Sequence, residues 1–219
     1  MTLKNPYASN RTDYVFNLLN PKKTDKILNI GISNIPEVEQ SLEPSVAECW
    51  TIDIDKQKIS AAAHFLKKTH LLHEDITKKT TLKDNYFDKV TMIEVLEHIK
   101  DDRAALRFIN KKLKPSGILI IAVPNDAFLH YFNPVKYAEH ERHYSNALIR
   151  QRLQEAGFTI EHFNLVERWT LLANLYIHLF RKFVLRQNRP FGVFTTLSHN
   201  SYKQQNRRGM DIIIKARKI

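Results

Sequence analysis

The chain has 219 residues, of which 43% are hydrophobic and 26% are charged, and this composition excludes an intrinsically disordered chain and fits one α/β domain. Its single cysteine, Cys49, excludes an intrachain disulfide, so we expect a reducing, cytoplasmic compartment. The net charge is +11, and residues 126–219 hold 15 of the 34 Lys and Arg but only 7 of the 23 Asp and Glu. This basic part fits an anionic partner, a membrane surface or a plain solvated face.

Strand-like and helix-like segments alternate along most of the chain. A helix is predicted over 12–19 and ends at Asn20-Pro21, because a residue before proline avoids the helical region. In chain order the pattern then predicts strand 26–31, helix 36–42, strand 49–55, helix 56–68, strands 70–76 and 87–95, helix 101–113 and strand 117–124. After an irregular stretch come helix 145–156, strand 158–166, helix 168–186 and strand 210–218. This alternation predicts a parallel sheet with helices on both faces and a ligand-binding edge where the strands end.

We interpret residues 1–219 as a single domain with three special regions. Residues 1–24 hold the N-terminal helix. We expect residues 125–144, which are rich in aromatic and histidine side chains, to form an acceptor-side loop, that is, a loop where a second substrate would bind. We expect residues 167–208 to form a lid-like insertion on the same side. Helix 168–186 carries an apolar stripe with basic flanks, which fits a lid, a dimer contact or a peripheral membrane contact.

Three residues at predicted strand ends are of a kind that binds nucleotides. Gly31 follows the first strand, where a glycine lets the backbone approach a ligand. Asp53 comes 22 positions later at the end of the second strand, where nucleotide-binding folds place a ribose-binding acid. Asp75 ends the third strand and could accept a hydrogen bond from an adenine amine. Each has an ordinary alternative: a strand-ending glycine, a helix cap at Asp53 or Asp55, and a turn aspartate.

Longer segments resemble a known family. FDKVTMIEVLEHIKD (87–101) followed by LKPSGILIIAVPN (113–125) resembles the fourth- and fifth-strand signature of class I S-adenosylmethionine-dependent methyltransferases. The closest likeness is to the small-molecule group that includes ubiquinone-biosynthesis and glycan-modifying enzymes. The other matching segments are ILNIGISN, TIDID, HEDI, HERHYSNALIRQRLQEAGFTIE and GMDIIIKARK. Their order and spacing are more specific than any single segment.

The resemblance implies a Rossmann-like, doubly wound sheet of seven strands, mostly parallel with an antiparallel last strand. It also implies S-adenosylmethionine as the cofactor and no metal. At the matching positions it implies these contacts: Asn29 at the family's first-motif aspartate, Gly31 and Ile32 with the methionine part, Asp53 with the ribose, Ile54 with the adenine face, Asp75 and Ile76 with the adenine edge, and Glu94 at the sulfonium end.

The first loop departs from the family pattern Asp-x-Gly-x-Gly-x-Gly. Asn29 replaces the aspartate, and Ser33 and Ile35 replace two glycines. Isoleucine disfavours a positive φ, so the loop must take another path or be strained. A catalytically degenerate binding or scaffold protein therefore stays open as the alternative function.

Three histidines are candidate general bases for methyl transfer. His98 follows the fourth strand, and His140 and His143 lie in the expected acceptor-side loop. A structural role for each is the alternative. We expect a small-molecule, glycan or lipid acceptor, with an anionic one favoured by the basic residues, and leave the oligomeric state open. Nucleic acid is not expected, because no Asn-Pro-Pro-Tyr-type motif follows the fourth strand.

Overall fold

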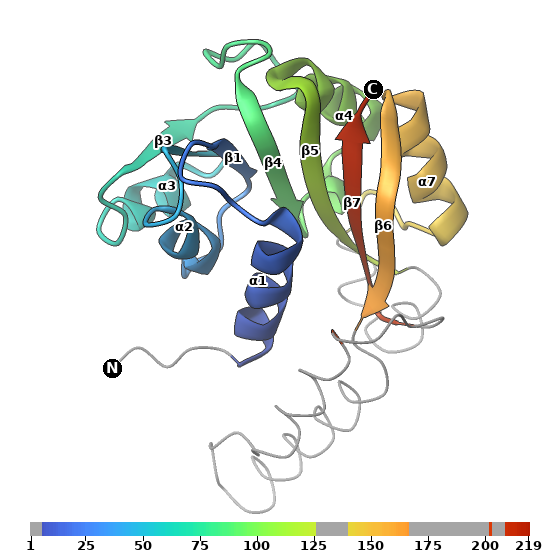
Figure 1. Ribbon diagram of the computed structural model, residues 1–219, viewed down its shortest axis with the longest axis horizontal. Helices are drawn as coiled ribbons and strands as arrows, with labels where there is room; N and C mark the ends of the chain where they lie inside the picture. Colours follow the sequence, from blue (N-terminus) through green and yellow to red (C-terminus); the bar gives the residue numbers. More distant parts are fainter. Residues whose placement is uncertain (1–5, 126–139, 167–201, 203–208) are drawn as a thin grey trace, which may run out of the picture.

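The computed structural model describes residues 6–125, 140–166, 202 and 209–219, which form one seven-stranded sheet flanked by helices (Figure 1). The strands are β1 (Lys26–Ile30), β2 (Glu48–Asp53), β3 (Thr69–His73), β4 (Phe87–Ile93), β5 (Leu113–Pro124), β6 (Phe158–Val166) and β7 (Asp211–Lys218). The helices are α1 (Pro6–Leu19), α2 (Glu37–Leu42), α3 (Lys56–Ala62), the 3-10 helix η1 (Leu96–His98), α4 (Asp102–Lys112) and α7 (Asn146–Glu155). Within these ranges no helix has the length and apolar character needed to cross a membrane. Helix 168–186 and the aromatic residues Phe128, Tyr131, Phe132 and Tyr137 lie outside the described residues.

The order of the strands across the sheet is β3-β2-β1-β4-β5-β7-β6. β1 to β5 pair in parallel, whereas β7 lies antiparallel between β5 and β6. Ile30 pairs with Ile52 on one side and with Met92 on the other, so β1, β2 and β4 end at one edge. The predicted Rossmann-like sheet with its antiparallel last strand is confirmed, and it places the loops after β1, β2 and β4 side by side.

Apolar side chains of the central strands alternate between the two faces of the sheet. On one face, Leu28 and Leu119 pack with α4 and α7, and on the other, Ile27 and Ile120 pack with α1 and α2. Relative to its predicted start, β5 begins four residues earlier, because Leu113 pairs with the first residue of β4. Both layers of helices therefore hold the same central strands, whose ends carry the candidate site.

The predicted helix 56–68 is too long. In the structure the chain turns after α3, because three successive backbone amides are captured by one carboxylate. The N–H groups of Lys67, Lys68 and Thr69 donate to Glu43 Oε1 over 2.9, 2.8 and 2.9 Å. Amides held in this way cannot donate to helix carbonyls, so the helix ends before them.

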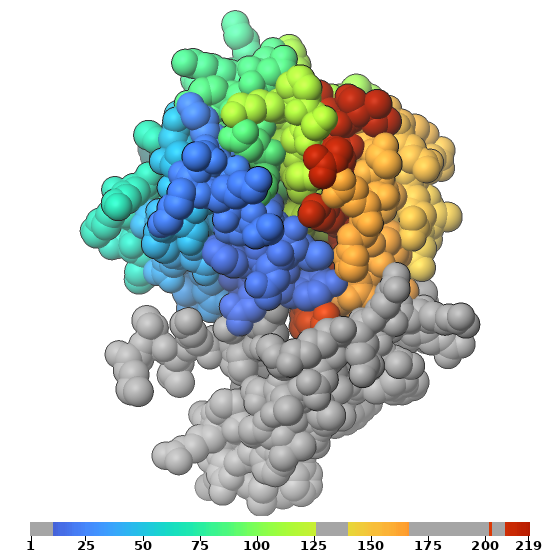
Figure 2. Space-filling model, in the orientation of Figure 1, coloured from blue at the N-terminus to red at the C-terminus, as the bar shows by residue number. Residues whose placement is uncertain are grey.

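Helix α1, near the start of the chain, packs beside the last two strands. Its blue surface lies next to the orange surface of β6 in Figure 2. The Tyr14 hydroxyl lies 2.9 Å from His162 Nε2 and accepts a hydrogen bond of 2.9 Å from Asn164 Nδ2. Arg11 Nη2 donates to Asp211 Oδ2 over 2.8 Å. Because β7 runs antiparallel, Asp211 at its start lies at the same edge as the ends of β1, β2 and β4, so α1 reaches that edge.

A buried carboxylate joins α4, α7 and the segment before α7. Asp102 is 2% exposed, and its Oδ2 accepts hydrogen bonds of 3.0 Å from both the Tyr144 hydroxyl and Arg152 Nε. Arg142 Nε lies 2.9 Å from the same oxygen. The two guanidinium groups compensate a charge that would otherwise be costly to bury. The interaction also fixes residues 140–144 beside η1.

We predict that Asp102→Ala lowers the free energy of unfolding by about 3–5 kcal/mol, because it leaves a buried guanidinium and a buried hydroxyl without their acceptor. Urea unfolding followed by circular dichroism measures the loss. Arg103→Ala is the matched control, since it breaks the exposed Arg103–Glu155 pair between the same two helices and is expected to cost far less than Asp102→Ala. Equal losses in the two variants would contradict the role given to Asp102.

Candidate functional site

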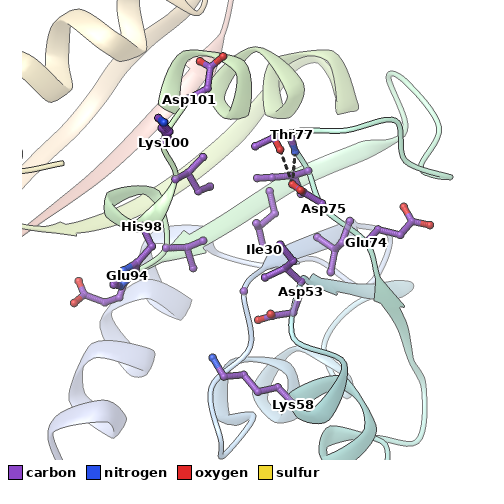
Figure 3. Close-up of a pocket in the computed structure, with 16 residues that line it drawn as sticks. Ile30, Asp53, Lys58, Glu74, Asp75, Thr77, Glu94, His98, Lys100 and Asp101 are labelled. Atoms are coloured by element: carbon purple, nitrogen blue, oxygen red, sulfur yellow. Dashed lines mark hydrogen bonds between the residues drawn. The ribbon is translucent and has the colours of Figure 1, made fainter. Parts of the chain in front are cut away.

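A cavity of about 660 Å³ opens where β1, β2 and β4 end (Figure 3). Figure 3 shows Glu94 and His98 together at one side of it, away from Asp53 and Asp75. Its lining is contributed by the loops after four strands: Ile30, Gly31, Ile52, Asp53, Ile54, Lys58, Glu74, Asp75, Ile76, Thr77, Glu94, Val95, His98, Ile99, Lys100 and Asp101. The structure therefore brings together most of the predicted cofactor residues, which are far apart in the sequence.

The loop after β1 depends on glycine at position 31. Gly31 has a φ of 84°, and a Cβ atom added to it would lie 2.3 Å from Val95 Cγ2. Both the backbone conformation and the close approach of Val95 exclude a side chain here. The backbone of Gly31 is also held on two sides, since its N–H donates to the Ile52 carbonyl over 2.9 Å and its carbonyl accepts from Asn29 Nδ2 over 2.7 Å.

The departures from the family's glycines do not strain this loop. The non-glycine residues with positive φ in the described part of the chain are Asn20, Asn85, Glu94 and Ser116. Ser33 and Ile35 are not among them, so the loop takes another path in which bulkier residues fit. The Ile35 side chain is 43% exposed and points away from the core. Asn29 and Ile32, also predicted as cofactor residues, are 3% and 4% exposed and do not line the cavity.

Asp53 and Asp55 have different roles, as the sequence pattern predicts. Asp53 lines the cavity and accepts backbone hydrogen bonds of 2.7 Å from Ile32 at Oδ2 and from Asp55 at Oδ1. Each carboxylate oxygen retains acceptor capacity for a ligand hydroxyl. Asp55 instead caps α3, accepting from the backbone N–H groups of Gln57 and Lys58. Between the two aspartates Ile54 is 68% exposed beside the cavity, an apolar surface of the kind a purine ring covers.

Asp75 is a turn residue that also lines the cavity. Its Oδ1 accepts from the Thr77 N–H over 2.9 Å and from the Thr77 hydroxyl over 2.7 Å, so it is a turn residue, and β3 ends earlier than predicted. These hydrogen bonds, the Thr77 hydroxyl first, lower the pKa of Asp75. The side chain also lines the cavity next to Ile76. Contact of this pair with an adenine edge remains a prediction.

The charge of the lining fits S-adenosylmethionine. Five carboxylates and two lysines line the cavity: Asp53, Glu74, Asp75, Glu94, Asp101, Lys58 and Lys100. An acidic cleft attracts a ligand that carries a sulfonium cation. Together with the exposed apolar surface of Ile54 and the Asp53 carboxylate in the cavity lining, these charges suit the sulfonium, adenine and ribose parts of the cofactor.

Glu94, directly after β4, is held in an uncommon conformation. Its φ is 54°, which costs energy in a residue with a Cβ and is often found at functional sites. The Glu94 carboxylate lies 3.7 Å from Nη1 of Arg11, whose other nitrogen binds Asp211. Glu94 therefore lines the cavity and also faces α1.

The three candidate bases meet at the β4 side of the cavity. His98 belongs to η1 and lines the cavity, and its ring centroid lies 4.9 Å from that of His140. The His140 and His143 ring centroids are 6.0 Å apart. Histidines separated by more than forty positions in the sequence are thus neighbours in the structure, and their role as bases stays a prediction.

Glu97 was not predicted as a site residue. Its side chain is 1% exposed, and in the described part of the chain neither carboxylate oxygen has a hydrogen-bond partner. Burial, and then the negative charge of Glu94, raise the pKa of Glu97 to about 9. One carboxylate oxygen of Glu97 and one ring nitrogen each of His98 and His140 lie within 4.8 Å of one another, an arrangement that could hold a divalent cation. The only signal for Glu97 in the sequence was the Glu-His pair in VLEHI, and this pair does not reveal that the glutamate is buried.

Residues 7–163 match the family described as a methyltransferase domain. The chain belongs to this methyltransferase family. The expected class I S-adenosylmethionine-dependent type is confirmed, and S-adenosylmethionine is its cofactor.

Curated proteins similar to this methyltransferase include ubiquinone biosynthesis O-methyltransferases. That of Aliivibrio fischeri is 26% identical over 190 residues, which are 77% of this chain and 81% of the relative. The mitochondrial enzyme of Dictyostelium discoideum is 33% identical over 57 residues, 26% of this chain and 18% of the relative. The enzyme of Idiomarina loihiensis is 25% identical over 138 residues, 61% of this chain and 54% of the relative. The chain thus spans about half or less of the length of two of these relatives.

Solved structures share the fold at low identity. The N-methyltransferase NodS from Bradyrhizobium japonicum, in complex with S-adenosyl-L-homocysteine, has a TM-score of 0.66 at 17% identity, with 99% of this chain and 89% of that chain covered. The [4+2]-cyclase SpnF has a TM-score of 0.68 at 18% identity, with 96% and 81% covered. One fold therefore supports different reactions, so the reaction has to be inferred from the residues of the site.

We predict that Glu97→Gln stabilises the methyltransferase increasingly as the pH rises from 5 to 8. An unfolded glutamate loses its proton near pH 4.3, whereas folded Glu97 keeps it up to about pH 9. The free energy of unfolding of the wild type therefore falls as the pH rises through this window, and Glu97 contributes up to about 1.4 kcal/mol per pH unit to the fall. A glutamine at position 97 does not titrate, so the variant lacks this contribution. Urea unfolding at three pH values, in chelator to exclude bound metal, measures the difference.

The control for Glu97→Gln is Glu155→Gln, because ion pairing with Arg103 lowers the pKa of that exposed carboxylate and it stays ionised throughout the same window. The difference in free energy of unfolding between Glu155→Gln and the wild type is expected to stay constant between pH 5 and 8. A constant difference for Glu97→Gln as well would show that Glu97 is ionised in the folded protein.

We predict that Asp53→Ala weakens S-adenosyl-L-homocysteine binding by at least tenfold, because the lost carboxylate removes charge-assisted hydrogen bonds of about 1.5–3 kcal/mol each. Asp55→Ala removes a helix cap and is expected to lower the melting temperature instead, with a smaller change in affinity. Isothermal titration calorimetry and thermal unfolding on both variants separate the two effects. A larger loss of affinity at Asp55 would contradict the assignment.

Proposed function

We propose that this methyltransferase transfers the methyl group of S-adenosylmethionine to a hydroxyl oxygen of a small organic acceptor. The observation that carries the proposal is the meeting of His98 and His140 at the β4 side of the cofactor cavity. A neutral hydroxyl is a weak nucleophile and benefits from a base at the point of attack, and histidine is the side chain best suited to take a proton near neutral pH. The ubiquinone O-methyltransferases among the curated relatives support oxygen as the acceptor atom.

The cofactor would lie across the ends of β1, β2 and β3. Asp53 would accept hydrogen bonds from the ribose hydroxyls, Ile54 would cover the adenine ring, and Asp75 with Ile76 would face the adenine edge. The path of the loop at Gly31 leaves room for the methionine part. When bound, S-adenosylmethionine supplies an electrophilic methyl group, which would point to the Glu94 and His98 side of the cavity.

The chain's part in the reaction is to orient the acceptor and remove its proton. The acceptor oxygen would approach in line with the carbon–sulfur bond, so that a new oxygen–carbon bond forms as the carbon–sulfur bond breaks. The proton of the hydroxyl would pass to a ring nitrogen of His98, and S-adenosyl-L-homocysteine would leave as the second product. His140, beside His98, would orient its ring or receive the proton in its place.

The acceptor is a small molecule with a hydroxyl group, and a phenolic, glycan or lipid-type acceptor each fits this chemistry. An anionic acceptor has less support. Of the cations described near the site, Arg11 and Arg142 are engaged with Asp211 and Asp102, and Lys58 and Lys100 share the cavity with five carboxylates. A scaffold function, the alternative from the altered loop, loses its main support because Ser33 and Ile35 cause no strain.

We predict that His98→Asn lowers kcat by about 10²–10⁴-fold with a phenolic acceptor while the affinity for S-adenosyl-L-homocysteine stays within twofold. Formation of S-adenosyl-L-homocysteine from a panel of hydroxylated and amine acceptors measures turnover, and calorimetry measures affinity. Glu74→Gln, on the opposite side of the cavity, is the control and should keep kcat.

Two results would contradict the proposed function. Turnover of amine but not hydroxyl acceptors would assign nitrogen as the acceptor atom. Wild-type protein that gives no heat and no thermal shift with millimolar S-adenosylmethionine or S-adenosyl-L-homocysteine would favour the scaffold function.

A further inference from the structure

A buried cluster of polar side chains lies directly beneath the cofactor loop. It consists of Asn29 on β1, Glu39 on α2, Thr51 on β2 and Thr91 on β4, none of which is more than 3% exposed. Asn29 Oδ1 accepts from the Thr91 hydroxyl over 2.6 Å, and Asn29 Nδ2 donates to Glu39 Oε1 over 2.5 Å. The Thr51 hydroxyl donates to the same Glu39 oxygen over 3.1 Å. We call these four residues the Asn29 cluster.

The Asn29 cluster is connected to the backbone of the loop. Asn29 Nδ2 also donates to the carbonyl of Gly31 over 2.7 Å. A side-chain amide has two N–H groups, so one can serve Gly31 and the other Glu39. The Glu39 oxygen that accepts this hydrogen bond therefore fixes the plane of the Asn29 amide group, which also holds the Gly31 carbonyl.

The position of Glu39 is unusual for its residue type. A glutamate on a short helix is normally solvated, and burying a carboxyl is costly unless it is hydrogen-bonded. Glu39 is 1% exposed, and burial raises its pKa, with the negative charge of Asp53 adding to the effect. No methyl-transfer step uses this group, so its burial calls for another role.

We propose that Glu39 is a positioning residue for the cofactor: its carboxyl orients the Asn29 amide, and this amide holds Gly31 in the binding conformation. The proposal rests on the proposed function, because it concerns the loop that would bind S-adenosylmethionine.

Asn29 and Glu39 are then a matched pair. An aspartate at position 29, as in the family pattern, would place a second carboxylate within hydrogen-bonding distance of Glu39 in a buried site. It would also remove the donor to the Gly31 carbonyl. The amide at position 29 donates to a carboxyl at position 39 in either protonation state, whereas two carboxyl groups there would have to share one proton.

Calorimetric titration of the full chain with S-adenosyl-L-homocysteine tests the pair. Glu39→Gln retains an oxygen that accepts from Asn29 and Thr51, so its Kd should stay within twofold of wild type. Glu39→Ala and Asn29→Asp should each raise the Kd at least tenfold. The double variant Asn29→Asp with Glu39→Gln restores a donor–acceptor pair between the two positions and should bind at least threefold more tightly than Asn29→Asp alone.

Glu43→Ala is the matched control, because Glu43 caps the same helix but holds the amides of residues 67–69 instead of the loop. It should lower the melting temperature and leave the Kd within twofold. All titrations are made at a temperature where circular dichroism shows each variant folded.

Wild-type affinity in Glu39→Ala or in Asn29→Asp would overturn the positioning role. An equal loss of affinity in Glu43→Ala would do the same, because it would show that any disturbance of α2 weakens binding. A wild-type protein that binds neither S-adenosylmethionine nor S-adenosyl-L-homocysteine would instead overturn the proposed function.

Discussion

The backbone of Gly31 passes so close to Val95 that the chain has no room for a Cβ atom there. This close approach brings the loop after β1 against the loop after β4, and both residues line the cavity. The conformation is maintained from three directions: by the Ile52 carbonyl of β2, by the Asn29 amide below, and by the Asp53 carboxylate, which takes the N–H of the next residue. Gly31 is therefore the one glycine of the family pattern that this loop cannot lose.

The second part of the site depends on a different buried interaction. Asp102 binds two arginines and a tyrosine and so fixes residues 140–144 against α4 and η1. His140 and His143 approach His98 because of that attachment. The side of the cavity that holds Asp53 and Asp75 is thus built from loops that follow parallel strands, whereas the segment with His140 and His143 is held by charge.

Much of the fold could be predicted from the sequence, because the apolar runs of β1, β4 and β5 and the caps of α3, α4 and α7 are local signals. The cap at Asp55 and the place of Asp53 at a strand end beside the cavity were also predictable, since one precedes a helix and the other ends a strand. The end of α3 was not, because the carboxylate that captures the following amides comes from Glu43, more than twenty positions away.

The buried acids of the site were equally hidden. Glu39 and Glu97 look like solvated residues in the sequence, and only tertiary packing places them in the interior. Of the two alternatives left open for Ile35, strain or another path of the backbone, the structure shows the second, since Ile35 has no positive φ.

The place of β7 has a consequence for synthesis of the protein on the ribosome. β7 lies between β5 and β6, so β6 has no partner in the sheet and β5 has only β4 until residues 211–218 have been translated. The nascent chain therefore carries an unpaired, strongly apolar edge at β5, and unpaired edges of this kind recruit other chains. Arg11 likewise has to wait for Asp211, 200 residues later, before α1 can close over the sheet. The sheet can therefore close only after β7 has left the ribosome.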